Sequence, residues 1–231
     1  MNSTIKMVVF DMAGTVVNED NVVYKTLQKA INEAGYNFTL DEVLAQGAGK
    51  EKLQAIKSIL SVYAKNDDEA LADSIFTNFM AQLKDAYAEL NVLPQDNAAE
   101  LFAALKERKI LTVFNTGYNR ATAQSLVDKL GWKKGVEFDS LVTATDVSEN
   151  RPNPDMILFA MQQFGITNGN EVVKVGDSII DIEEGRNAGC IYSIGITTGA
   201  HTFEQLQSAK PDYIIGNLLE LLPVLDDHIS K

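Results

Sequence analysis

The sequence of 231 residues contains a single cysteine, Cys190, so an internal disulfide is excluded. We expect a reducing, cytoplasmic setting, because structural disulfides belong mainly to secreted proteins. The N-terminus lacks a basic segment followed by an apolar stretch, and no apolar run approaches the roughly 18 residues that a membrane helix needs. Neither a signal peptide nor a membrane partner is therefore expected.

Positive charge is scarce as well. The 20 lysine and arginine residues face 32 aspartate and glutamate residues, which gives a formal net charge of −12. We expect no nucleic-acid partner, because few basic side chains remain to meet phosphates. A phosphate or phosphonate substrate would need a metal and a few local cations to offset its charge. The only two histidines, His201 and His228, are expected at the surface.

Strand and helix patterns alternate through most of the sequence. Hydrophobic residues make up 45% of it, enough for a full core with an insertion or a second domain. The expected strands span 7–10, 110–114, 141–143, 171–175, 191–196 and 213–215. The helices between them span 97–109, 121–130, 155–164 and 179–188, and a C-terminal helix is expected after the last strand. Such alternation predicts an α/β fold with right-handed βαβ units in a doubly wound, Rossmann-like parallel sheet.

The region between the first two strands has a different pattern. Residues 16–21 are expected to form a polar linker, and residues 22–91 have helical periodicity without a convincing strand. We therefore predict an inserted all-helical domain, the cap, over residues 17–91. The core domain is predicted over residues 1–16 and 92–231.

The stretch from Met7 to Thr15 is the most informative. Four apolar residues form a strand that ends at Asp11, and Gly14 then allows a sharp turn and close approach of a ligand. Ligands of parallel sheets bind beyond the carboxyl ends of strands, which makes Asp11 a candidate nucleophile or metal ligand. The alternative is a strand that merely ends in a charge and turns at a glycine.

Further candidate site residues follow three other strands. They are Thr116, Gly117 and Tyr118 after the second strand, Arg151 in the loop after the third, and Asp177 and Asp181 after the fourth. Each has a simpler interpretation. The Thr-Gly pair could be an ordinary turn, the arginine could be exposed, and the two acids could be a helix N-cap and a solvated helix face.

Together these segments resemble the motifs of the haloacid dehalogenase (HAD) superfamily. Its first motif reads Asp-x-Asp-Gly-Thr or Val, and the alanine at Ala13 resembles the phosphonatase branch (phosphonoacetaldehyde hydrolases and relatives). Thr116 matches the Ser or Thr of the second motif, and Gly-Asp-x-x-x-Asp at Asp177 matches the fourth. Most HAD phosphatases carry a lysine where Arg151 stands, whereas phosphonatases carry arginine.

The resemblance implies a hydrolase with Mg²⁺ as its cofactor. The implied metal ligands are Asp11, Asp177, Asp181 and a backbone carbonyl near Ala13. Asp11 is the implied nucleophile, which forms an aspartyl-phosphate, and Arg151 holds both this carboxylate and the phosphoryl group. The implied substrate-binding residues are Thr116, Gly117 and Tyr118.

Ala13 cannot protonate a leaving oxygen, a role that aspartate has in ordinary HAD phosphatases. The resemblance implies phosphonatase chemistry instead, in which a cap lysine forms an imine with the substrate. Lys52 matches that lysine, with Lys50 as an alternative, and both could simply solvate a helix face. Where phosphonatases have a histidine and a methionine in this segment, the sequence has Ala55 and Ala48.

The resulting prediction is a Mg²⁺-dependent phosphonatase-like hydrolase that cleaves a small 2-oxo-alkylphosphonate through an aspartyl-phosphate and a cap-lysine Schiff base. One alternative is a phosphomonoesterase for a small sugar or organic-acid phosphate, similar to phosphoglycolate phosphatases. Another is a non-catalytic binding protein with the same fold, against which the joint presence of all four motifs argues. The expected partner is a small phosphorylated or phosphonate substrate, and the protein could be a monomer or a homodimer.

Overall fold

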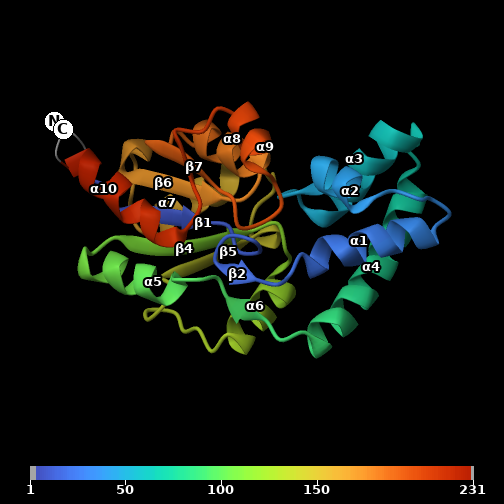
Figure 1. Ribbon diagram of the computed structural model, residues 1–231, viewed down its shortest axis with the longest axis horizontal. Helices are drawn as coiled ribbons and strands as arrows, with labels where there is room; N and C mark the ends of the chain where they lie inside the picture. Colours follow the sequence, from blue (N-terminus) through green and yellow to red (C-terminus); the bar gives the residue numbers. More distant parts are fainter. Residues whose placement is uncertain (1–3, 230–231) are drawn as a thin grey trace.

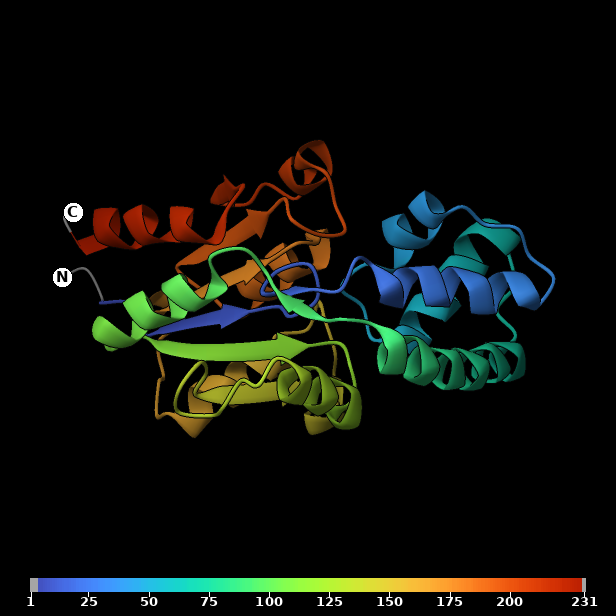
Figure 2. The ribbon, with the colours of Figure 1, turned by 60° about the horizontal axis from the view of Figure 1, so that its bottom comes forward.

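The computed structural model describes residues 4–229, and side-chain surroundings for residues 4–226. A six-stranded parallel sheet has β1 at its centre, as Figure 2 shows. In order, its strands are β5 (Ser140–Thr143), β4 (Leu111–Thr116), β1 (Met7–Phe10), β6 (Val172–Gly176), β7 (Tyr192–Ile196) and β8 (Tyr213–Ile215). All six lie where the sequence predicts strands, so the expected parallel α/β fold is confirmed.

Helices cover both faces of the sheet. They are α5 (Ala98–Glu107), α6 (Arg120–Lys129), α7 (Asp155–Gln163), α8 (Ile179–Asn187), α9 (Phe203–Ser208) and α10 (Leu221–Ile229), of which α9 is not predicted. Successive strand residues point to opposite faces. Val8 and Phe10 accordingly pack with apolar side chains of α5, α6 and α10, whereas Met7 and Val9 pack with those of α7. β1 is therefore buried on both sides, as its apolar sequence predicts.

The cap is all-helical, as expected, and lies beyond the carboxyl end of the sheet (Figure 1). Its elements are α1 (Val22–Glu33), α2 (Leu40–Gly47), α3 (Lys52–Ile59), a π-helical turn (Leu60–Ala64) and α4 (Glu69–Glu89). Within the described residues, no helix is long and apolar enough to cross a membrane. The domain limits at residues 17 and 91 stay a prediction.

The two connections between sheet and cap pair with each other. β2 (Val17–Asn18) and β3 (Leu93–Pro94) form a two-stranded antiparallel ribbon. The expected polar linker over residues 16–21 is therefore partly wrong, because Val17 and Glu19 are both buried. The sequence shows that this segment is rich in polar residues, but it does not show that another segment of the same chain, β3, pairs with it.

Candidate active site

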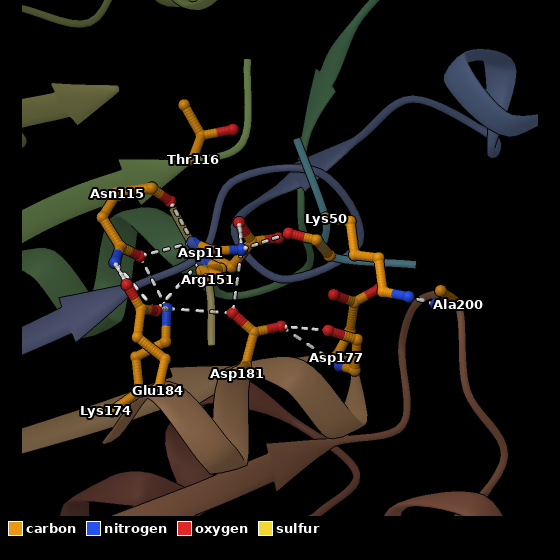
Figure 3. Close-up of polar contacts among 12 residues, drawn as sticks. Asp11, Lys50, Asn115, Thr116, Arg151, Lys174, Asp177, Asp181, Glu184 and Ala200 are labelled. Carbon is orange, nitrogen blue, oxygen red and sulfur yellow. Dashed lines mark hydrogen bonds and ion pairs between the residues drawn. The ribbon is translucent and has the colours of Figure 1, made fainter. Parts of the chain in front are cut away.

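The polar residues that follow the strands converge at one edge of the sheet. Asp11 follows β1, Thr116 ends β4, Asp177 follows β6, and Asp181 lies in the first turn of α8. They meet because β4, β1 and β6 are adjacent and parallel. Figure 3 shows the acids around Arg151, which comes from the loop between β5 and α7.

Arg151 is 1% exposed and contacts four polar residues. Its Nη1 atom lies 2.8 Å from Asp11 Oδ1 and 3.0 Å from Asp181 Oδ1, and its Nε atom lies 3.0 Å from Glu184 Oε2. Its Nη2 atom donates to Oδ1 and to the backbone oxygen of Asn115, at 2.6 and 2.9 Å. Burial lowers the pKa of the guanidinium, but the neighbouring carboxylates raise it by more. The net effect is a raised pKa, so the group stays charged. The arginine is therefore a buried cation that holds Asp11, not an exposed loop residue.

Two residues that contact Arg151 or Asp181, Lys174 and Glu184, are not among the site residues predicted from the sequence. Lys174 Nζ lies 2.9 Å from Asp181 Oδ1 and 3.1 Å from Glu184 Oε2. It also donates to Asn115 Oδ1 at 2.6 Å, and the Asn115 amide donates to Glu184 at 2.9 Å. Two signals could have found them. Lys174 interrupts an apolar strand, and Glu184 stands three residues after Asp181, on the same helix face.

Three buried carboxylates could hold a cation. One oxygen each of Asp11, Asp177 and Asp181 lies within 4.8 Å of the others. Asp181 Oδ1 is buried and accepts no well-aligned hydrogen bond from the described residues, although two cations lie close to it. Burial, and then the charges of the other two acids, raises the pKa of Asp177 well above its ordinary value. A divalent cation would relieve this repulsion, and hard oxygen ligands suit Mg²⁺.

Two glycines leave room for Asp177. A Cβ atom at Gly14 would lie 2.3 Å from Asp177 Oδ2, and one at Gly199 would lie 1.9 Å from the same atom. The amide of Ala200 donates to that oxygen at 2.6 Å. Only residues without a side chain fit this close approach, which fixes the carboxylate at the edge of the sheet.

Ala13 lies in the loop that follows Asp11. The amide of Gly14 donates to the Val17 carbonyl at 2.9 Å, and the Val17 amide donates to the Met12 carbonyl at 2.8 Å. These bonds do not use the Ala13 carbonyl, whose expected role as a metal ligand stays a prediction. The methyl side chain has no proton to donate.

The expected substrate-binding segment runs along the border with the cap. Thr116 is buried, and its Oγ1 accepts from the Tyr118 amide at 3.3 Å. Gly117 packs against the cap backbone, since a Cβ atom there would lie 2.8 Å from the Lys50 oxygen. The Tyr118 hydroxyl lies 2.8 Å from that of Tyr87 on α4. This segment therefore contacts the cap, and it continues from β4, the neighbour of the strand that leads to Asp11 of the acidic cluster (Asp11, Asp177 and Asp181).

The two candidate cap lysines have different surroundings. Lys52 is 6% exposed, and its Nζ lies 5.0 and 5.5 Å from the ring centres of Tyr24 and Tyr118. It donates to the Lys50 carbonyl at 2.8 Å. Burial lowers the pKa of Lys52 to about 8, although nearby carboxylates oppose the shift. Lys50 is only partly buried and donates instead to Ser58 Oγ at 3.1 Å.

The loop before α3 also touches the acidic cluster. Gly49 has φ +74°, and a Cβ atom there would lie 2.2 Å from Ile180 Cγ2 and 2.3 Å from Ser178 Oγ. Its carbonyl faces Arg151 Nη1 at 3.4 Å, and its amide donates to the Tyr24 hydroxyl at 2.9 Å. The cap is thus closed onto the sheet through the backbone of this loop.

The expectation of two surface histidines is wrong for His201. Its ring is 5% exposed, and Nδ1 accepts from the Ile179 amide at 3.0 Å. Nε2 lies 3.4 Å from the Leu44 carbonyl of the cap. The ring satisfies a free amide at the start of α8, a need that the sequence alone does not show. The side chain of His228 lies outside the described residues.

A cavity of about 330 Å³ extends from Lys52 between the cap and the sheet. Lys52, Gly117 and Tyr118 are among its lining residues. The side formed by α4 is apolar, with Phe76, Phe79, Met80 and Leu83, whereas Glu51, Asn119, Thr122 and Thr145 add polar groups elsewhere in the lining. The cavity thus offers space beside the buried amine.

Comparison with known proteins gives consistent matches. The model of the haloacid dehalogenase-like hydrolase family matches residues 5–189. A phosphonoacetaldehyde hydrolase of Parabacteroides distasonis is 32% identical, over 85% of this chain and 78% of the relative, and one of Paraburkholderia xenovorans is 26% identical, over 96% and 95%. The crystal structure of a phosphonoacetaldehyde hydrolase like protein from Oleispira antarctica superposes with a TM-score of 0.82 at 21% identity, covering 98% of this chain and 93% of that one.

The resemblance to the phosphonatase branch is thereby confirmed, as is the prediction of a hydrolase. The family generally uses Mg²⁺, which agrees with the buried acidic triad. The fold, the convergent acids and the family match agree, and the chain belongs to the haloacid dehalogenase-like hydrolases.

Proposed function

We propose that the protein is a Mg²⁺-dependent hydrolase that cleaves the carbon–phosphorus bond of a small 2-oxo-alkylphosphonate. The observation that carries this proposal is the Lys52 amine, buried between two tyrosine rings next to the acidic cluster. Only a neutral amine adds to a carbonyl carbon, and burial brings the pKa of Lys52 to about 8, so a useful fraction is neutral near neutral pH. The relatives named phosphonoacetaldehyde hydrolase support the same substrate class.

Asp11 is the proposed nucleophile. Arg151, 2.8 Å from one of its oxygens, fixes its direction. A carboxylate oxygen attacks phosphorus while the carbon–phosphorus bond breaks, and the electron pair of that bond moves into the iminium group on Lys52, which becomes an enamine. The phosphoryl group is then an aspartyl-phosphate that water hydrolyses. A proton then adds to the enamine carbon and restores the iminium, with an equivalent proton released when water hydrolyses the aspartyl-phosphate. Hydrolysis of the iminium releases the dephosphorylated ketone or aldehyde and the free Lys52 amine.

The charge of the phosphonate must be met in a buried place. Mg²⁺ held by Asp11, Asp177, Asp181 and the Ala13 carbonyl would supply positive charge close to the phosphoryl oxygens. The Thr116 hydroxyl, at the end of the adjacent strand, is proposed to donate a hydrogen bond to the same group. Closure of the cap excludes water from these contacts and so strengthens them.

Ala13 favours carbon–phosphorus over ester cleavage. An ester oxygen leaves with help from a general acid, which alanine cannot give. An enamine carbon leaves without protonation at that point, because the iminium nitrogen takes the electron pair. A phosphomonoesterase would therefore be slow with this residue.

The cavity next to Lys52 supports a substrate with a substituent beyond its carbonyl carbon. The side of the cavity that α4 forms is apolar, with residues such as Phe79 and Leu83, and suits an alkyl group. We therefore propose a 2-oxo-alkylphosphonate with a short alkyl chain, such as 2-oxopropylphosphonate or a longer homologue, as a better substrate than the aldehyde.

Borohydride trapping tests the proposal. The enzyme is incubated with Mg²⁺ and 2-oxopropylphosphonate, reduced with borohydride, and examined by peptide mapping for a secondary amine on lysine. We expect the adduct on Lys52, and its loss together with phosphate release in Lys52→Arg, because arginine cannot form an imine. Lys50→Arg is the matched control, since this side chain points to Ser58 rather than to the acidic cluster.

The outcomes separate the two enzyme activities. An adduct on Lys50 would move the assignment to that residue and leave the mechanism. No adduct on either lysine, with hydrolysis of phosphate esters intact in Lys52→Arg, would identify a phosphomonoesterase instead.

A further inference from the structure

Glu19 is a buried acid that the mechanism above does not use. It follows β2 and is 3% exposed. Its Oε2 accepts from the Tyr87 hydroxyl at 2.9 Å and from the Val23 amide at 3.1 Å. An acid in such a place is costly unless its partners or its protonation compensate for lost water.

Two tyrosines extend from this acid toward Lys52. The hydroxyls of Tyr87 and Tyr118 lie 2.8 Å apart, and either can donate to the other. The ring of Tyr118 lies 5.5 Å from Lys52 Nζ, and both residues line the cavity. A hydrogen-bonded chain thus leads from Glu19 to the hydroxyl of Tyr118, a residue whose ring lies beside the Lys52 amine.

We propose that Glu19 stores the proton that imine formation on Lys52 requires and delivers it through Tyr87 and Tyr118. This role rests on the proposed function. Imine chemistry needs a group that gives and takes a proton next to the amine. The position at which phosphonatases carry a histidine for such transfers is Ala55 here, which cannot exchange a proton.

Addition of the neutral Lys52 amine to a ketone gives a neutral carbinolamine, because one amine proton moves to the former carbonyl oxygen. The carbon–oxygen bond of the carbinolamine breaks, and its hydroxyl takes the proton of Tyr118 and leaves as water. Tyr118 regains a proton from Tyr87, and Tyr87 regains one from the Glu19 carboxyl. The products are an iminium cation, one water and the Glu19 carboxylate, and imine hydrolysis later returns the proton along the same path.

The surroundings of Glu19 and Lys52 bring the pKa values of these two side chains close together. The charged and titratable groups that face Glu19 are Tyr24 and Lys25 on α1, Lys52 on α3, Tyr87 on α4 and Tyr118 after β4. Burial raises the pKa of Glu19 to about 7 and lowers that of Lys52 to about 8. Because the two pKa values lie close together, the neutral amine and the neutral acid coexist far more often than they would at the ordinary values of 10.5 and 4.5.

A distinct pH dependence follows. The pair must hold one proton, so imine formation is expected to rise as pH passes about 7 and to fall as pH passes about 8. Without the Glu19 carboxyl, only Lys52 titrates. The rate should then rise through about pH 8 and show no fall above it.

The test uses Glu19→Gln, which keeps the shape but holds no titratable proton, and Tyr87→Phe, which cuts the path and keeps the acid. Glu107→Gln, an exposed glutamate on α5, is the matched control. The readouts are the rate of borohydride-trapped adduct with 2-oxopropylphosphonate as a function of pH, and kcat and KM for phosphate release. We expect kcat to fall about 10²–10⁴-fold in both test variants with KM unchanged, and the alkaline fall to vanish in Glu19→Gln.

The result can also contradict the role. An adduct in the wild type with an unaltered pH profile in Glu19→Gln would overturn this inference and leave the proposed function in place. A loss that is uniform across pH, with the alkaline fall retained, would assign Glu19 a purely structural part. No adduct in the wild type would overturn the imine mechanism itself, and the proton store with it.

Discussion

Gly117→Ala tests whether the contact between cap and sheet is needed for catalysis. The backbone of Gly117 is not in the left-handed region, so alanine has no conformational penalty there. Its Cβ atom would, however, lie 2.8 Å from the Lys50 oxygen and 3.1 Å from the Lys50 carbonyl carbon. Both atoms belong to the cap backbone, which must therefore retreat.

The retreat acts directly on the reacting amine. Lys52 stands two residues after Lys50 and begins α3, so its Nζ moves with the displaced backbone. Misplacement of a catalytic group by about 1 Å can cost about 10²-fold in rate, and the displacement needed here is smaller. We expect kcat to fall by about 10- to 100-fold, which corresponds to about 1.4–2.7 kcal/mol of transition-state stabilisation.

Steady-state phosphate release and thermal unfolding measure the two consequences separately. The unfolding temperature should change little, because the cap can open slightly without exposing the core. Gly216→Ala is the control, since the nearest atoms to a Cβ there lie at 3.6 and 3.9 Å, which is ordinary contact. An unchanged kcat in Gly117→Ala would show that close contact at this glycine is not required and refute the reasoning.

Three further changes test the acidic cluster. Asp11→Asn removes the anionic nucleophile and a metal ligand, so phosphate release should become undetectable in a standard assay, and EDTA should have the same effect on the wild type. Measurable turnover in either case would contradict this. Ala13→Asp restores a general acid and should raise hydrolysis of esters with poor leaving groups about 10²–10⁴-fold, and no gain would mean that another residue supplies the proton. Lys174→Met leaves two buried carboxylates with less positive charge, so the free energy of unfolding in urea should fall by about 3–5 kcal/mol. A much smaller loss would mean that Arg151 alone balances them.

The sheet and its strand-end residues are predictable because they depend on local rules. Apolar runs such as Met7–Phe10 identify buried strands, and parallel strands place their carboxyl ends together. Asp11, Asp177 and Asp181 therefore come together as the spacing suggests. Their proposed roles as nucleophile and metal ligands remain predictions that the experiments above address.

Contacts between segments that are far apart in the sequence could not be predicted from it. Whether Lys50 or Lys52 is buried depends on where α3 begins and on which tyrosines lie opposite, and neither is a matter of spacing. The pairing of β2 with β3 brings together residues far apart in the chain, and it hides Glu19 within what looks like a polar linker. Such partners become visible only when the whole fold is known.

The bond between the hydroxyls of Tyr87 and Tyr118 has one end on the cap helix α4 and the other on the sheet edge. A cap that swings outward on the ribbon of β2 and β3 must break it. In that open form Lys52 meets water and returns toward its ordinary, protonated state, which is inert toward carbonyls. Docking of the cap would then lower the pKa of the Lys52 amine and restore the Tyr87–Tyr118 hydrogen bond in the same movement. Free aldehydes and ketones of the cell that do not bring about this docking would find no reactive lysine.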